Sequence, residues 1–193
     1  TVHTYGDGTT KRISVFGLGE DEKLTSDGVR ALASKISAYA NSLKLESFSV
    51  DGDSFGLIDS DFAQAFSEGL VLGAYEFLDY KSKKKDPNTL NFVNILGDVD
   101  VLSITKGEII ANGVAYARDL GNHPANEMTP SIMASQAEEI AKSAGMKATI
   151  FDVSEFQKMG LGSFYGVAQG SVGKVPAKMI IVEYNGGKKS DKP

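Results

Sequence analysis

Histidine and cysteine are among the side chains most often used for metal binding and covalent catalysis. The chain has two histidines and no cysteine. Neither His3 nor His123 has a second histidine or a carboxylate at the spacing of a helical metal motif such as H-E-x-x-H. His123 stands beside Pro124, where packing at a helix end is the favoured interpretation. With these two isolated histidines, we expect no nucleophile triad.

Two glycine-containing stretches partly match phosphate-binding loops. Gly17-Leu18-Gly19 follows a predicted strand, but the third glycine of G-x-G-x-x-G would fall at Glu22, whose carboxylate would repel a pyrophosphate. Gly170–Lys174 is similar to the end of a G-x-x-x-x-G-K-[ST] loop. There, Ala168 replaces the first glycine and Val175 replaces the hydroxyl residue that would hold magnesium. We interpret both stretches as turns.

An acidic stretch, Asp51–Gly56, begins like a calcium-binding loop. The fifth position of that loop is Phe55 and the twelfth is Phe62, where a bidentate glutamate is required. We therefore expect an acidic turn, followed by Asp59 and Asp61 as caps of the next helix. Motif chemistry alone identifies no catalytic, cofactor-binding or metal-binding residue.

The composition is that of an ordinary globular protein, with 193 residues, 41% hydrophobic and 23% charged. A net charge of −5 argues against a general nucleic-acid partner, and the dense basic stretch Lys81–Lys85 predicts a solvated loop. The lack of cysteine agrees with a cytoplasmic, reducing compartment. No segment approaches the ~20 apolar residues that span a bilayer, so we expect no membrane partner. Because the chain starts at Thr1, we expect the start of its first domain to be missing.

The elements that must position any site alternate between strands and helices in the first half of the chain. Apolar residues at three- and four-residue steps predict helices over about 26–43 and from Asp61 onward. Alternating stretches predict strands over 13–16, 46–50 and 90–96. Since this order is typical of α/β folds, we expect a largely parallel sheet with covering helices.

A long helix over 106–120, ended by Gly121 and Pro124, is predicted to link two domains. Thr129-Pro130 then supplies an N-cap and a first helical residue. The remaining predicted elements are a helix over 130–144, a strand over 148–151, a short helix capped by Ser154 and a strand over 179–184. The last strand is almost continuously apolar, as in strands buried on both faces, so we expect the second domain to be cut short.

Several segments, in order along nearly the whole chain, carry a family resemblance. Glu68–Lys81 is similar to the end of an N-terminal domain, and Ala117–Asn126 with Thr129-Pro130 is similar to an interdomain helix and an Asn-x-Pro-Ala-Asn signature. The segments similar to the start of a catalytic domain are 159–163, 167–171 and 181–187. The family that these segments resemble is the leucyl aminopeptidase (cytosol aminopeptidase) family.

The resemblance implies a macro-like α/β domain over 1–104, an interdomain helix and linker over 105–128, and the incomplete beginning of a zinc-peptidase-like α/β catalytic domain over 129–193. It implies an enzyme that removes N-terminal residues, often leucine, from peptides with two divalent metal ions: zinc, manganese, magnesium or cobalt. It also implies a cytoplasmic homohexamer. The family's metal and catalytic motifs follow the strand over 179–184, and this sequence contains no match to them. We therefore expect no site residue, no bound metal and no activity in this chain alone.

The alternative interpretation is a stand-alone α/β module that binds a nucleotide-type ligand or mediates subunit contacts. Its weakness is the apolar strand over 179–184, which would leave apolar surface exposed. A nucleotide-dependent enzyme would rest only on the incomplete glycine motifs described above.

Overall fold

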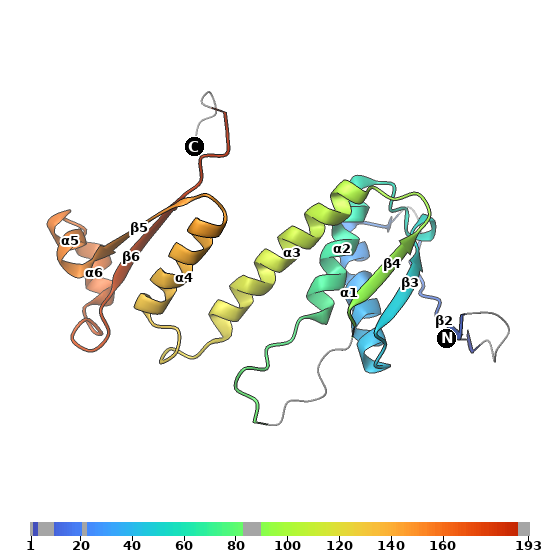
Figure 1. Cartoon of the computed structure of the whole chain (residues 1–193), viewed down its shortest axis with the longest axis horizontal. Coiled ribbons are helices and arrows are strands. Elements are labelled where there is room, and N and C mark those ends of the chain that lie inside the picture. The colour runs from blue at the N-terminus through green and yellow to red at the C-terminus, as the bar shows by residue number, and fades with distance from the viewer. Residues whose placement is uncertain (1, 4–9, 21–22, 83–89, 189–193) are drawn as a thin grey trace. The chain divides into compact units, whose positions relative to one another are not determined.

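The computed structural model describes residues 2–3, 10–20, 23–82 and 90–188. It divides the chain into two compact units, Thr1–Arg118 and Asp119–Pro193. Helices and strands occur in both units (Figure 1), which confirms the predicted α/β class.

Two packed helices form one layer of the first unit. Helix α1 spans Ser26–Ser42 and α2 spans Ser60–Ala74. The Thr25 side chain caps α1, and the Asp59 carboxylate caps α2 by accepting two backbone N–H groups of its first turn, at 2.9 and 3.0 Å. Both helices and the predicted cap at Asp59 are therefore confirmed. The same prediction for Asp61 is wrong, because Asp61 lies within the first turn of α2 and donates its backbone N–H to Asp59.

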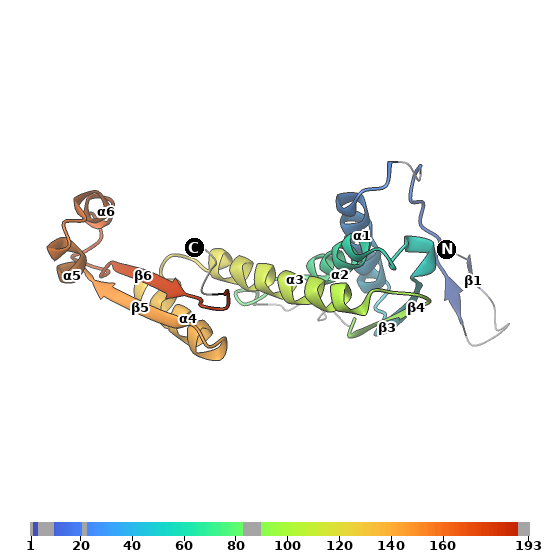
Figure 2. The same ribbon diagram turned by 90° about the horizontal axis from the view of Figure 1, so that it is seen from above.

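A two-stranded parallel sheet forms the second layer of this unit. Strand β3, Ser47–Asp51, pairs with β4, Phe92–Leu96, and Ser47 lies opposite Phe92. The sheet lies beside α1 and α2 (Figures 1 and 2). The core between the layers consists of Val29, Ala33, Ile36, Val50, Leu57, Ala65 and Phe66. Alternate strand residues face this core, as the alternating sequence predicts.

The strand predicted over 13–16 is wrong. Strand β2 covers only Arg12–Ile13 and pairs antiparallel with β1, Val2–His3. Val15 is 82% exposed, whereas Phe16 is partly buried against the core although it lies outside the strand.

Helix α3, Val101–Asn122, begins earlier and ends later than predicted. It begins at Val101 because Asp100 acts as its cap. The Asp100 carboxylate accepts the backbone N–H groups of Leu102 and Ser103, at 3.1 and 3.2 Å, and the Ser103 hydroxyl at 2.9 Å. Gly121, expected just beyond the helix, lies within it, so the end is set instead by the approach to Pro124.

The second unit contains three helices and two strands among its described residues. Its helices are α4 (Pro130–Ser143), α5 (Val153–Lys158) and α6 (Gly162–Ala168). Its strands are β5 (Lys147–Asp152) and β6 (Lys178–Glu183). Thr129 caps α4 through its side chain, as predicted, by accepting the Ile132 N–H at 3.4 Å. Phe156 of α5 is fully buried and meets Phe164 of α6 edge to face, with ring centroids 5.0 Å apart.

The parallel pairing expected for the first half of the chain is confirmed by β3 and β4, whereas β5 and β6 of the second unit are antiparallel. Asp152 lies opposite Lys178, so the segment that connects the strands leaves and returns at the same end of the pair. A parallel pair would instead require a connection that crosses to the opposite end of the sheet.

Two further details of the second unit differ from the sequence-based prediction. The cap of α5 is Asp152 rather than Ser154, in a capping box in which the Glu155 carboxylate accepts the Asp152 N–H at 2.7 Å. Strand β6, predicted to be buried on both faces, has Ile181 and Val182 each 42% exposed. Within the described residues β6 pairs with β5 alone, which leaves this apolar surface uncovered.

Candidate functional site

No group of three or more His, Asp or Glu side chains suited to a metal ion occurs among the described residues. His3 belongs to the first unit and His123 to the second. His123 directly follows α3, and its backbone N–H donates to the Asp119 carbonyl at 3.2 Å. The expectation that this chain supplies no metal ligand stays a prediction.

The acidic stretch after β3 uses its carboxylates for local hydrogen bonds. Asp51 accepts the Ser54 hydroxyl, and Asp53 accepts the Asp98 backbone N–H at 2.9 Å. Residues Asp53–Phe55 form a short 3₁₀ helix, η2. These bonds tie the end of β3 to the segment after β4, as an acidic turn would.

The same stretch contains one serine pattern that the expectation of no nucleophile does not include: Gly52–Gly56 matches the Gly-x-Ser-x-Gly of a hydrolase nucleophile elbow. Ser54 lacks the strained backbone of such an elbow, since the one described non-glycine residue with positive φ is Lys44. The Ser54 hydroxyl donates to Asp51, and no described histidine side chain belongs to this unit. The pattern is therefore structural.

The second glycine stretch is a turn, as interpreted from the sequence, whereas the first is irregular backbone. Residues 17–19 have neither helix nor strand structure, and α1 begins only at Ser26, so no helix N-terminus follows the glycines directly. In the second stretch, the Lys174 backbone N–H donates to the Ser171 carbonyl at 2.8 Å. Glu22 and residues 83–85 of the basic stretch lie outside the described residues.

A charged cluster joins α1 and α2. The Arg30 Nε donates to Glu68 at 2.6 Å, and the Gln64 amide donates to the other Glu68 oxygen at 2.7 Å. Arg30 also pairs with Asp27 at the helix surface. The hydrogen bond with Glu68 is the main cause that raises the pKa of Arg30 above its ordinary value. Because the Glu68 side chain is only 8% exposed and has two donors, the cluster serves to hold the helices together.

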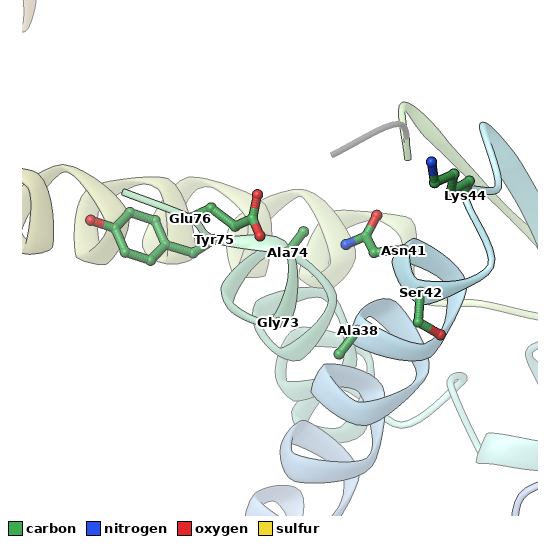
Figure 3. Close-up of a pocket in the computed structure, with 8 residues that line it drawn as sticks. All are labelled: Ala38, Asn41, Ser42, Lys44, Gly73, Ala74, Tyr75 and Glu76. Atoms are coloured by element: carbon green, nitrogen blue, oxygen red, sulfur yellow. The ribbon is translucent and has the colours of Figure 1, made fainter. Parts of the chain in front are cut away.

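A pocket of about 480 Å³ lies where the carboxyl-terminal ends of α1 and α2 meet (Figure 3). Its lining residues are Ala38, Asn41, Ser42, Lys44, Gly73, Ala74, Tyr75 and Glu76. The Asn41 amide nitrogen points toward the Glu76 carboxylate in the close-up. The Arg118 guanidinium lies over the Tyr75 ring, 5.4 Å from the ring centroid, which is a cation–π contact within the first unit.

Sequence reasoning did not identify this pocket. Its residues come from two helix ends that are about thirty positions apart, and neither end shows a pattern of residues typical of a binding site. The sequence does indicate that Glu68 is unusual. It is a charged residue between Ala65 and Gly69, on a helix face that otherwise consists of small and apolar residues.

Comparison with known proteins gives matches over both units. Residues 1–84 match the N-terminal domain of the cytosol aminopeptidase family, and residues 115–193 match the catalytic domain of that family. A probable cytosol aminopeptidase of Pseudomonas fluorescens is 33% identical over 95% of this chain and 38% of its own length. One from Sulfurihydrogenibium is 36% identical over 88% of this chain and 35% of its own length.

Solved structures give the same result. The bottromycin maturation enzyme BotP aligns with a TM-score of 0.72 and 25% identity over 84% of this chain and 35% of that chain. A mutant of tomato leucine aminopeptidase aligns with a TM-score of 0.68 and 26% identity over 80% of this chain and 32% of that chain.

The two α/β units match, in order, the N-terminal domain and the catalytic domain of one two-domain family. The chain belongs to the cytosol aminopeptidase family. It spans about 38% of the length of the curated relatives it matches. None of the helices in the described ranges combines the length and apolar character needed to cross a membrane.

Proposed function

We propose that the protein acts as a leucyl aminopeptidase, which removes N-terminal residues from peptides with two divalent metal ions. The observation that carries this proposal is the ordered match to both domains of one peptidase family. A structural relative supports metal dependence, because one of its solved structures is described as BotP in complex with Mn. Zinc, magnesium and cobalt are the other candidate ions.

The described residues do not fit such a metal pair. A two-metal site needs several carboxylate or imidazole ligands, and no cluster of three occurs in the described part of this chain. We therefore assign no catalytic or metal-binding role to any residue of this chain. The 193-residue polypeptide should neither hold the two ions nor hydrolyse peptides by itself.

The contribution of these residues to the enzyme is then architectural. We assign 1–104 to a macro-like N-terminal domain, 105–128 to an interdomain helix and linker, and 129–193 to the beginning of the catalytic domain. The division into two units near Arg118 and the separate family matches support this assignment. The enzyme would act on peptide substrates in the cytoplasm as a homohexamer, without nucleic-acid or membrane partners.

An activity assay with a matched control tests this proposal. The purified 193-residue chain is incubated with Mn²⁺ and leucine p-nitroanilide, beside tomato leucine aminopeptidase as the positive control. We expect no release of nitroaniline above background and no Mn²⁺ retained in equilibrium dialysis. Turnover that depends on Mn²⁺ and disappears with a chelator would contradict the assignment of no site residues.

A second measurement tests the activity of the whole protein. The intact mass of the polypeptide from its natural source is compared with the 20.5 kDa of this sequence. A larger protein should show metal-dependent release of N-terminal leucine. A larger protein without that activity would refute the aminopeptidase proposal.

A stand-alone assembly module is the second candidate, favoured by apolar side chains exposed on α3. Leu102 is 83% exposed and Ile109 67% exposed. Seven residues separate them, which places them on one side of the helix. An assembly module should self-associate as its concentration rises, as measured by sedimentation velocity, and a nucleotide ligand should raise its melting temperature. A monomer at every concentration, with no nucleotide effect, excludes this candidate.

A further inference from the structure

Two Asn-Gly pairs occur in the sequence, Asn112-Gly113 and Asn185-Gly186. Asparagine is a thermolabile residue, and a following glycine makes it more reactive because no Cβ hinders the glycine backbone nitrogen. That nitrogen can attack the side-chain amide of the asparagine and close a five-membered succinimide ring. Both asparagines and both glycines are exposed, so access to solvent does not distinguish the two pairs. The backbone around each pair does.

The first pair lies in the interior of helix α3. Helical dihedral angles hold the Gly113 nitrogen away from the side-chain carbonyl carbon of Asn112, and the Gly113 N–H takes part in the i to i−4 hydrogen bonds of the helix. Asn112 must therefore leave the helical conformation before the ring can close. Because α3 is anchored nearby by the buried residues Gly107 and Ala111, this local opening costs free energy.

The second pair follows strand β6, which ends at Glu183 (Figure 1). The pairing of β6 with β5 also ends there, where Glu183 lies opposite Lys147. Residues 184–186 have neither helix nor strand structure. In the part of the chain that the structure describes, no backbone carbonyl accepts the Gly186 N–H. The ring can therefore close at Asn185 without breaking any helix or strand.

We propose that Asn185 is a site of spontaneous deamidation and that helix α3 protects Asn112 from the same reaction. The Gly186 nitrogen gives up its proton to water and forms a bond to Asn185 Cγ, while the Cγ–Nδ2 bond breaks and the departing amide group takes up a proton to leave as ammonia. Water then opens the succinimide at either of its carbonyl groups, which gives aspartate or isoaspartate. This inference does not depend on the proposed function.

The reaction places a new negative charge at the end of the β5–β6 pair. The product carboxylate stands two residues after Glu183, whose own carboxylate lies 3.3 Å from the Lys147 ammonium group. Opening of the ring toward isoaspartate also inserts the side-chain methylene into the backbone. Deamidation therefore changes both the charge and the path of the chain directly after β6.

Peptide mapping by mass spectrometry, after incubation of the folded 193-residue chain at mildly alkaline pH, tests the proposal. Each deamidation raises the mass of its peptide by about 1 Da. We expect the peptide with Asn185 to accumulate this product, and Asn112 to react at least about tenfold more slowly, because it waits for α3 to open. Equal rates at the two positions, or an Asn185 that stays intact, overturn the proposal.

The same incubation in guanidinium chloride, above the unfolding midpoint, is the matched control for the helix. Once α3 is unfolded, Asn112 and Asn185 should react at similar rates, because both precede glycine. An Asn112 that stays slow in the unfolded chain would assign its protection to the neighbouring residues in the sequence, and the proposed role of α3 would then be wrong.

Two variants identify the reacting atoms. Asn185→Gln should abolish the product at this position, because closure would then need a less favourable six-membered ring. Gly186→Ala should slow the reaction, because its methyl group hinders the backbone nitrogen. That methyl group would meet the Tyr184 ring, which is 72% exposed and free to move aside, so neither variant should change the urea midpoint. An undiminished mass increase in Asn185→Gln would refute the assignment to Asn185.

Discussion

Alanine at Gly107 tests the contact that holds α3 against α2. A Cβ at this position would lie 2.9 Å from the Ser67 Cβ, and it would clash more severely with the Gln64 backbone carbonyl. Ordinary van der Waals contact begins near 3.4 Å. Because a carbonyl of a packed helix cannot rotate away as a side chain can, the two helices must separate locally to admit the methyl group.

The expected magnitude follows from a comparison with Gly113 in the same helix. A Cβ at Gly113 meets nothing within 4 Å, so alanine there should raise the free energy of unfolding by up to ~1 kcal/mol through helix propensity alone. Gly107→Ala gains the same propensity but adds an overpacking cost of ~1–3 kcal/mol. Since the propensity gain cancels between the variants, they should differ by about 1–3 kcal/mol.

Equilibrium urea unfolding, followed by circular dichroism, measures this difference. We expect Gly113→Ala to be more stable than wild type. Gly107→Ala should be less stable than wild type, or close to it if the overpacking cost is small. Equal midpoints for the two variants would mean that α3 does not pack on α2 through Gly107.

Three further perturbations test other contacts. Arg30→Ala leaves the Glu68 carboxylate buried without its ionic partner, so the free energy of unfolding, measured by urea denaturation, should fall by ~2–3 kcal/mol. An unchanged urea midpoint would show that solvent screens the pair. The pKa of Asp100 is lowered chiefly by the hydrogen bond from the Ser103 side chain. Its charged form therefore adds stability above the unfolded pKa of about 3.9, and this stability is lost as pH falls through the lower folded pKa. Asp100→Asn should be less stable than wild type at pH 6, and acid titration should bring the two together; a constant difference down to pH 2 contradicts this cause. Phe156→Ala should destabilise the second unit by ~3–5 kcal/mol without altering amide exchange in the first. Equal loss of protection in both units would contradict their independence.

Most of the first unit could be predicted from local pattern. The apolar spacing of α1 and α2 and the alternation in β3 and β4 each specify one buried face, and the structure buries those faces. The cap at Asp59, like the cap at Thr129 in the second unit, follows from a short polar side chain placed just before an apolar helix. These features depend on neighbours within a few residues, which a single sequence contains.

The features that the sequence leaves open depend mainly on contacts that are distant in sequence. The direction of β6 depends on where the chain returns after α5 and α6, and an apolar run carries no information about that direction. The pocket depends on how closely the ends of α1 and α2 approach, which is set by glycines such as Gly73. For α5, two acceptable caps stood two residues apart, and the capping box with Glu155 decided in favour of Asp152.

The charges at the two ends of β6 bear on how this chain behaves at high concentration. Met179–Val182 is a short apolar run of high β-propensity, the kind of segment that nucleates cross-β stacking between copies. Lys178 pairs with Asp152 at one end, and Glu183 lies 3.3 Å from Lys147 at the other. Flanking charges of this type act as gatekeepers against intermolecular strand addition. Because salt screens exposed charges, fibril formation in stored samples should accelerate as ionic strength rises.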